Sequence, residues 1–151
     1  MQYSKSFDWL SEYFNNFGQK PVLLFDKNTE EYCSPLLPPE ILHNSLIISI
    51  EPGESSKSLG TAELIWNKLI DNNIRRTQPL ICVGGGVITD LGGFVASVYK
   101  RGMPLIHIPT SLLAMVDASI GGKNGVNFNS IKNQIGSHYS AHEILVNTSL
   151  L

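Results

Sequence analysis

Short apolar runs alternate with helical patterns along this chain, and this alternation constrains the fold more than any other feature. The runs have the length of buried strands, and the segments between them repeat apolar residues at the spacing of amphipathic helices. We expect strands at residues 21–25, 45–50, 79–83, 104–108 and 143–146, and helices at residues 7–17, 56–73, 87–100 and 110–118. Strands that alternate with helices form parallel sheets covered on both faces. The predicted fold class is therefore α/β, a Rossmann-like open, mainly parallel sheet with helices on both faces.

Two of the expected helices have candidate N-terminal caps. A serine, threonine, aspartate or asparagine before the first turn accepts a hydrogen bond from an amide that has no partner within the helix. Ser55 or Ser56 is the expected cap of the helix at 56–73, and Thr110 is the expected cap of the helix at 110–118.

Length and composition narrow the class of protein. A chain of 151 residues fits one domain, which we assign to residues 1–151, and a formal net charge of -2 gives no basic surface for nucleic acid or anionic membrane. The first residues lack the apolar core of a signal peptide, and no apolar run approaches the ~20 residues that span a bilayer. The two cysteines, Cys33 and Cys82, are too few for a disulfide framework, so we expect a cytoplasmic protein, with Cys82 buried in a strand.

Three consecutive glycines, Gly84, Gly85 and Gly86, stand between a predicted strand and a predicted helix. Glycines there let backbone N–H groups approach a phosphate, and the helix N-terminus adds positive potential. A diphosphate cradle is one interpretation of this turn, and a tight strand-to-helix turn without a ligand is the other.

The turn departs from the usual dinucleotide fingerprint. Thr89 stands where GxGxxG has its last glycine, and His107 and Ile108 stand where an acidic residue would hold the ribose. If a dinucleotide binds, the acid must come from elsewhere. Asp26 and Glu54 are the candidates, because each follows a predicted strand at the edge where parallel sheets bind ligands.

A second unusual stretch runs from residue 109 to residue 133. Asp117 ends an apolar helical run, and the glycines before Lys123 let the backbone turn sharply. A lysine on such a turn can donate to carboxylate or phosphate oxygens, and a following Lys132 and Asn133 can reach sugar hydroxyls. The alternative interpretations are a solvated loop lysine for Lys123 and a helix-end carboxylate for Asp117, and the residues alone do not choose between them.

The order and spacing of these motifs resemble the 3-dehydroquinate synthases, which are sugar-phosphate cyclases. The stretch GGGVITDLGGFVASVYKRGMPLIHIPTSLLAMVDASIGGKNGVNF carries most of the resemblance, and EPGESSKS, DKN and KNQIG continue it. The resemblance extends from about residue 22 to residue 151. Ser111, Asn124, Ser140, Ala141 and Asn147 depart from residues that are common in that family.

The resemblance implies NAD as a cofactor and a role for each matching residue. The residues implied to bind NAD are Asp26, Asn28, Glu54 and Lys57 at the adenosine, Gly84, Gly85, Gly86 and Val87 at the diphosphate, and Asp90, Thr110, Ser111, Asp117 and Lys132 at the nicotinamide and its ribose. The residues implied to act on the substrate side are Asp117, Lys123, Asn133 and, across the interface of a homodimer, Arg101.

The implied reaction converts 3-deoxy-D-arabino-heptulosonate 7-phosphate to 3-dehydroquinate and phosphate in the shikimate pathway of aromatic amino acid and chorismate biosynthesis. The family also has a helical C-terminal domain that binds a divalent metal, zinc or cobalt. We expect this domain to be absent from the chain, and therefore expect residues 1–151 alone to be inactive. His138 and His142 have the four-residue spacing of helical metal ligands, but the pattern around them favours a strand, so no metal ligand is assigned here.

Two other functions remain open. The chain could belong to another sugar-phosphate cyclase with a different sugar-phosphate substrate, because the motif from Asp117 to Asn133 is shared widely among them. It could also be a non-catalytic nucleotide-binding module.

Overall fold

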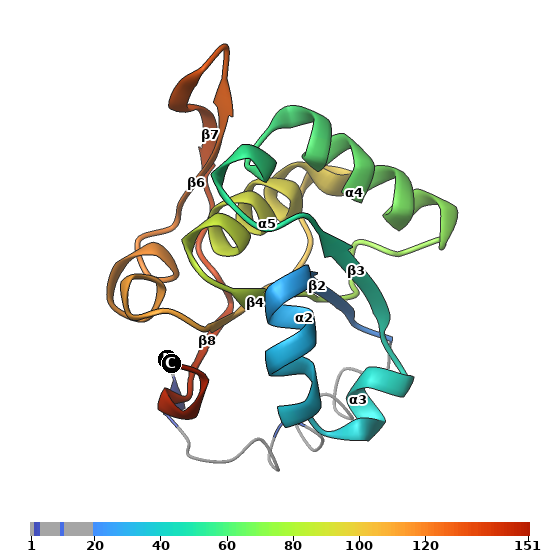
Figure 1. Ribbon diagram of the computed structural model, residues 1–151. Helices are drawn as coiled ribbons and strands as arrows, with labels where there is room; N and C mark the ends of the chain where they lie inside the picture. Colours follow the sequence, from blue (N-terminus) through green and yellow to red (C-terminus); the bar gives the residue numbers. More distant parts are fainter. Residues whose placement is uncertain (1, 4–9, 11–19) are drawn as a thin grey trace.

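The computed structural model describes residues 2–3, 10 and 20–151 and has the predicted α/β architecture (Figure 1). Six parallel strands form the sheet in the order β1-β8-β5-β4-β2-β3. They are β1 (Gln2–Tyr3), β2 (Val22–Asp26), β3 (Leu46–Ile50), β4 (Leu80–Gly84), β5 (Leu105–Pro109) and β8 (Glu143–Val146). The five strands predicted from residue 21 onward are confirmed, with ends that differ by one residue at most from the expected ranges.

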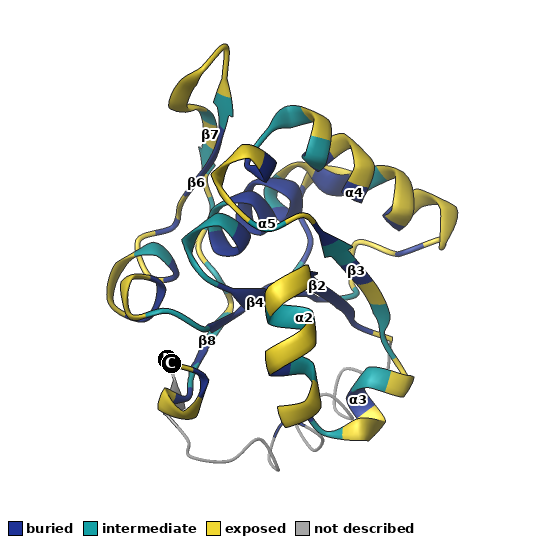
Figure 2. Ribbon diagram, in the orientation of Figure 1, coloured by how far each residue is buried: buried dark blue, intermediate teal, exposed yellow. Residues whose placement is uncertain are grey.

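Helices cover both faces of the sheet, as the alternation predicted. They are α2 (Lys27–Cys33), α3 (Pro39–His43), α4 (Leu59–Asp71) and α5 (Gly86–Val98), with short helical turns η1 (Ser34–Leu36), η2 (Glu54–Ser56), η3 (Tyr99–Arg101), η4 (Ala114–Ala118) and η5 (Thr148–Leu150). Helices α4 and α5 pack on one face, and α2 and α3 contribute to the core on the other (Figure 2). The helices α2 and α3 were not predicted, and the helix predicted at 7–17 falls, apart from Leu10, on residues that the structure does not describe.

The side chains of each strand belong to two different hydrophobic clusters, one on each face of the sheet, because successive side chains point to opposite sides. Leu80 and Cys82 of β4 pack beneath α5, whereas Ile81 and Val83 face the α2 side. All four are fully buried, and burial of an aliphatic side chain of this size contributes roughly 2 kcal/mol. Cys82 is thus a buried strand cysteine, as expected.

Helix α5 lies unusually close to β4. A Cβ added at Gly92 would fall 2.1 Å from the Sγ of Cys82, so the helix backbone rests directly on the strand at this point. A Cβ at Gly84 would similarly fall 2.6 Å from Ile88. Close packing between strand and helix therefore explains both glycines without a ligand.

Both predicted caps are corrected by the structure. Ser58 rather than Ser55 or Ser56 caps α4, because residues 54–56 form the separate turn η2 and the Ser58 hydroxyl accepts from the Thr61 amide at 3.2 Å. After β5, Ser111 rather than Thr110 takes the capping role, because the Ser111 hydroxyl accepts from the Ala114 amide at 3.3 Å. The Thr110 amide instead donates to the Gly84 carbonyl. The segment continues as η4, a widened π-helical turn rather than a regular α-helix.

An antiparallel hairpin that the sequence pattern did not predict stands beside the sheet (Figure 1). It pairs β6 (Lys123–Phe128) with β7 (Ile131–His138) and packs against α5 through the buried Val126 and the partly buried Ile135. Asn129 and Ser130, between the strands, have φ of 49° and 65°. Two positive values are typical of a tight hairpin turn of type I′.

Candidate functional site

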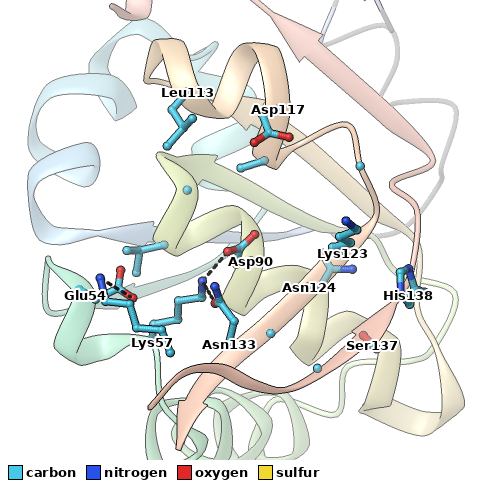
Figure 3. Close-up of a pocket in the computed structure, with 17 residues that line it drawn as sticks. Glu54, Lys57, Asp90, Leu113, Asp117, Lys123, Asn124, Asn133, Ser137 and His138 are labelled. Atoms are coloured by element: carbon cyan, nitrogen blue, oxygen red, sulfur yellow. Dashed lines mark hydrogen bonds and ion pairs between the residues drawn. The ribbon is translucent and has the colours of Figure 1, made fainter. Parts of the chain in front are cut away.

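A cavity of about 870 Å³ opens at the edge of the sheet where the parallel strands end (Figure 3). We call it the edge cavity. Four segments supply its walls: η2 after β3, the start of α5 after β4, η4 after β5, and the hairpin. Its lining residues are Glu54, Lys57, Gly86, Val87, Asp90, Leu113, Asp117, Ala118, Gly121, Lys123, Asn124, Gly125, Lys132, Asn133, Gly136, Ser137 and His138. Open parallel sheets bind their ligands at this edge.

The N-terminus of α5 opens into the edge cavity. Gly85 stands at the cap position and supplies no side-chain hydrogen bond, and no acidic residue occupies the first turn. The first amides of a helix have no partner within it, and the helix dipole adds positive potential there. Gly86 and Val87 line the cavity, so this end of α5 fits the phosphates of a dinucleotide.

The three glycines of the turn have different physical roles. Gly84 allows the close contact with Ile88, and Gly86 lies on the cavity. A Cβ at Gly85 would lie 3.3 Å from the Ser111 hydroxyl, which makes this position tight. The cradle interpretation therefore rests on Gly85, Gly86 and Val87, while Gly84 is explained by packing.

A buried lysine joins two walls of the edge cavity. The side chain of Lys57 is only 5% exposed, and its Nζ donates to Asp90 Oδ2 at 2.5 Å and to Asn133 Oδ1 at 2.6 Å. Burial raises the pKa of the Asp90 carboxyl above its ordinary value, and the adjacent Lys57 acts in the opposite direction. Lys57 thereby connects α5 to the hairpin.

Most of the residues implied to bind NAD or substrate meet at this cavity. The structure brings together Glu54, Lys57, Gly86, Val87, Asp90, Asp117, Lys123, Lys132 and Asn133. Lys123 is the exposed first residue of β6, and Asp117 lies in η4. Both charged groups line the edge cavity, and their roles toward NAD and substrate stay predictions.

Other predicted residues lie outside the lining of the edge cavity. Asp26 caps α2, where its Oδ1 accepts from the Thr29 amide at 2.8 Å, and Asn28 is exposed in the first turn of that helix. Thr110 and Ser111 follow β5, next to the Gly84–Gly85 peptide. Their assignments to NAD stay predictions.

Arg101 lies farther away than the other predicted residues. It is exposed in η3, after the C-terminal end of α5, whereas the edge cavity lies at the N-terminal end of this helix. The 13 residues of α5 separate the two ends by roughly 20 Å. Arg101 therefore does not contribute to the edge cavity of its own chain.

Several lining residues were not among the predicted site residues. They are Leu113, Ala118, Gly121, Asn124, Gly125, Gly136, Ser137 and His138. Most belong to the hairpin or the turn before it. The paired turn residues Asn129 and Ser130 were the available signal, because asparagine tolerates positive φ and favours such a turn.

No metal site emerges from the described part of the chain. Within residues 2–3, 10 and 20–151, no group of three or more histidine, cysteine, aspartate or glutamate side chains could hold a metal ion. His138 ends β7, and His142 Nδ1 accepts from the Leu105 amide at 3.3 Å, so the two histidines do not lie on one helix. No described helix is long and apolar enough to span a membrane.

Comparison with known proteins agrees with this arrangement. Residues 47–151 match the family described as 3-dehydroquinate synthase N-terminal. The chain belongs to this family. It is 49% identical over 110 residues to the 3-dehydroquinate synthase of Saccharolobus solfataricus, covering 73% of this chain and 31% of the relative. It is 47% identical over 137 residues to that of Alkaliphilus oremlandii, covering 89% of this chain and 37% of the relative. The chain thus spans about a third of the length of the 3-dehydroquinate synthases that it matches.

Solved structures of sugar-phosphate cyclases share the fold. A 2-epi-5-epi-valiolone synthase from Streptomyces hygroscopicus, with NAD+ and Zn2+ bound, superposes with a TM-score of 0.85 at 26% identity and covers 99% of this chain and 43% of that one. A 2-deoxy-scyllo-inosose synthase complexed with carbaglucose-6-phosphate, NAD+ and Co2+ gives a TM-score of 0.79 at 25% identity, with the same coverage. Identity is thus higher to the synthases of the 3-dehydroquinate family than to these two cyclases.

Proposed function

We propose that residues 1–151 form the NAD-binding domain of a 3-dehydroquinate synthase, which converts 3-deoxy-D-arabino-heptulosonate 7-phosphate to 3-dehydroquinate and phosphate. The observation that carries this proposal is the uncapped N-terminus of α5, which opens into a cavity that also gathers Lys57, Asp90 and Asn133. Membership of the family supports the specific reaction named in the proposal.

Each wall of the cavity has a distinct task in the proposal. The amides at Gly86 and Val87 would hold the diphosphate, and the carboxylate of Glu54 would accept from hydroxyl groups of the adenosine ribose. Asp90, Asp117 and Lys132 would surround the nicotinamide and its ribose. Bound NAD supplies a transient acceptor for hydride from the substrate.

The hairpin would bind the substrate. Asn133 Oδ1 accepts from Lys57, which leaves the Asn133 amide nitrogen as the group that can donate to a substrate oxygen. Lys123 projects from an exposed position, where its ammonium can pair with a carboxylate or phosphate. In this proposal these two residues orient the substrate against the cofactor, and neither exchanges a proton with it.

Three further parts of the proposal concern assembly, metal and compartment. Because Arg101 lies at the far end of α5, we assign it to the substrate phosphate of a second copy in a homodimer. A divalent metal, zinc or cobalt as in the two cyclases, would need ligands beyond the described residues, so no step is derived through it. The free and buried Cys33 and Cys82 favour the reducing cytoplasm.

A titration of the chain with NAD tests the proposal. We expect a dissociation constant of roughly 10⁻⁴ M or weaker, because the edge cavity is open and would leave part of the cofactor in water. We also expect no release of phosphate from the heptulosonate phosphate by residues 1–151 alone, since the described residues supply no metal ligands. Phosphate release at the rate of an intact synthase would contradict this expectation, and nanomolar NAD affinity would contradict the first.

A chimera provides the complementary test. This chain would replace the matching 37% of the Alkaliphilus oremlandii enzyme, with the rest of that enzyme unchanged. The chimera is expected to release phosphate in the presence of NAD. A chimera that folds but neither binds NAD nor turns over would reject the proposed function, because the other two thirds of the protein are those of the relative.

Another sugar-phosphate cyclase is the second candidate. The fold similarity to the 2-epi-5-epi-valiolone synthase favours it, whereas the higher identity to the 3-dehydroquinate synthases does not. Assays of the active protein with the heptulosonate phosphate, a different heptose phosphate and glucose 6-phosphate separate the two candidates.

A further inference from the structure

Asn127 is the point at which the hairpin meets η2. Its side-chain Nδ2 donates to Glu54 Oε1 at 2.9 Å and to the Glu54 carbonyl at 3.4 Å. Its backbone amide donates to the Lys57 carbonyl at 2.8 Å. One residue of the hairpin is thus attached to both ends of a segment, residues 54–57, that forms another wall of the edge cavity.

An irregularity in the hairpin makes these contacts possible. The pairing of β6 with β7 shifts register between Val126 and Phe128, so Asn127 has no paired partner in β7. Instead it forms a parallel bridge with Ser58, outside the hairpin. The extra residues lie in β7, because the four steps from Ile131 to Ile135 face only two steps from Val126 to Phe128, and irregularities of this kind occur frequently beside active sites.

The same side chain also holds the substrate-facing residue of β7. Asn127 Oδ1 accepts from the Asn133 amide at 3.0 Å. Asn133 has a φ of 56°, in the left-handed region that asparagine adopts more readily than most residues other than glycine. The Asn133 side chain accepts from Lys57 Nζ at 2.6 Å.

These contacts close a ring of four residues. Glu54 contacts Asn127, Asn127 contacts Asn133, Asn133 contacts Lys57, and Lys57 returns to Glu54 along η2. Both polar ends of the Asn127 amide are used, one on each side of the ring. Lys132 Nζ lies 3.8 Å from the same Glu54 Oε1, which makes that oxygen a shared acceptor.

We propose that Asn127 is a positioning residue that couples the cofactor-binding wall of the edge cavity, at Glu54, to its substrate-binding wall, at Asn133. This inference rests on the proposed function, which assigns the two walls to NAD and to the substrate. It adds a residue outside the lining of the edge cavity, which acts through its contacts with Glu54 and Asn133. A dinucleotide that fixes Glu54 would thereby also restrict Asn133 before the substrate arrives.

The exchange of one amide for a carboxylate tests the coupling. In Asn127→Asp, one carboxylate oxygen can still accept from the Asn133 amide. The amide nitrogen that donated to Glu54 is replaced by an oxygen of a carboxylate, which carries the same negative charge as Glu54 and repels it. We expect the Asn133 amide to exchange with solvent about tenfold faster, measured on the chain by NMR, and the dissociation constant for NAD to rise about tenfold. The matched control is Asn129→Asp, which makes the same change at the exposed hairpin turn, where no loss of protection at Asn133 is expected.

A double variant should restore the protection of the Asn133 amide but not the affinity for NAD. In Asn127→Asp with Glu54→Gln, the new glutamine amide can donate to the new aspartate, so the pair is re-formed with donor and acceptor exchanged. Protection of the Asn133 amide should return to within about threefold of the original, because the contact is again complete. NAD affinity should stay reduced, because the Glu54 carboxylate is gone.

Three outcomes would overturn the inference. They are an unchanged Asn133 exchange rate in Asn127→Asp, an equal acceleration throughout β4 that would mean general unfolding, or no recovery in the double variant. The proposed function fails separately: if the unaltered chain does not bind NAD, the assignment of the walls is wrong, whereas the exchange rates, recorded without NAD, still decide whether Asn127 positions Asn133.

Discussion

The two sides of the edge cavity are built by different means. On the sheet side, β4 and most of α5 are buried, and the helix is held by close apolar contact with the strand. On the hairpin side, every residue of β7 is exposed or only partly buried. The two sides therefore differ in how they are anchored, because apolar burial holds the sheet side, whereas the hairpin combines the buried Val126 of β6 with polar contacts.

The polar contacts of the hairpin are few and well separated. At its base, the Asn124 amide nitrogen donates to the Gly122 and Tyr139 carbonyls, and the hydroxyls of Ser97 and Ser137 lie 2.7 Å apart. Near its tip, Asn127 contacts Glu54, and Lys57 contacts Asn133, which are two of the contacts of the four-residue ring described above. A typical hydrogen bond contributes about 1 kcal/mol, so each of these contacts is a substantial share of what orients the hairpin.

The largest expected effect concerns the sheet side and its pH dependence. Burial lowers the pKa of His107 to about 4, and its Nδ1 has no hydrogen-bond partner. The unfolded chain therefore takes up a proton below about pH 6.5 that the folded chain refuses until about pH 4, so stability falls as the pH falls through this window. We expect the free energy of unfolding to fall by about 3 kcal/mol between pH 7 and pH 4 because of this residue.

Urea unfolding of His107→Leu at several pH values measures this contribution. The variant should lose most of the pH dependence between pH 6.5 and pH 4, whereas His43→Gln, which changes an exposed histidine, should retain it. If the free energy of unfolding of His107→Leu depends on pH as strongly as that of the original chain, His107 is not the source of this dependence.

The second prediction removes the cation that joins the two sides. Lys57→Met leaves the Asp90 carboxylate without its partner and releases Asn133 Oδ1. We expect a loss of about 2–3 kcal/mol in stability, less than for a fully buried pair because the Asp90 side chain is 21% exposed. Lys132→Met is the matched control, since its side chain is 72% exposed, and it should change stability by about 0.5 kcal/mol or less. Equal effects in urea unfolding would refute the distinction.

The third prediction addresses the hairpin backbone. A Cβ at Gly136 would lie 2.2 Å from the Asn124 carbonyl oxygen, so Gly136→Ala forces β6 and β7 apart. We expect a loss of about 2 kcal/mol, seen as faster amide exchange along β6 and β7 while β4 stays protected. Gly121→Ala serves as control, because its nearest atom lies 4.0 Å away. Loss of protection in β4 as well would show that the two sides unfold together.

The smallest expected effect separates the ligands of the two sides. In the active enzyme, Lys123→Ala should lower kcat/KM about tenfold or more, through loss of one charge-assisted contact, and leave NAD affinity nearly unchanged. Gly85→Val should weaken NAD first, since its side chain would crowd Ser111 and the start of α5. Titration with NAD and phosphate release on both variants decide the matter. A parallel loss of NAD affinity and turnover in Lys123→Ala would place the lysine on the cofactor side.

The sheet side was predictable from the sequence because its signals are local. Strands such as Leu80–Gly84 are continuous apolar runs, and the glycines after them mark the turn into α5. The cap of α4 was less predictable, because Ser55, Ser56 and Ser58 can all accept from a first-turn amide. Ser58 is the cap because the residues before it form the separate turn η2.

The hairpin was not predictable in this way. Residues 123–138 lack a regular alternation of apolar and polar residues, and its place depends on tertiary contacts of Asn124 and Asn127. The resemblance to the family nevertheless pointed to Lys123 and Asn133, which both line the edge cavity, while Asn127 became visible only through its contacts with Glu54 and Asn133.

The contact between Gly92 and Cys82 has a consequence for how the chain can vary. Because the space above the strand at position 82 is the space that a side chain at position 92 would need, the two positions share one volume. Because position 92 is already glycine, a residue larger than cysteine at position 82 has no compensating change available there. A side chain at position 92, in turn, requires a smaller residue at position 82 if α5 is to keep its height above the sheet. A substitution at 92 should therefore be accepted only together with a reduction at 82, such as Cys82→Gly.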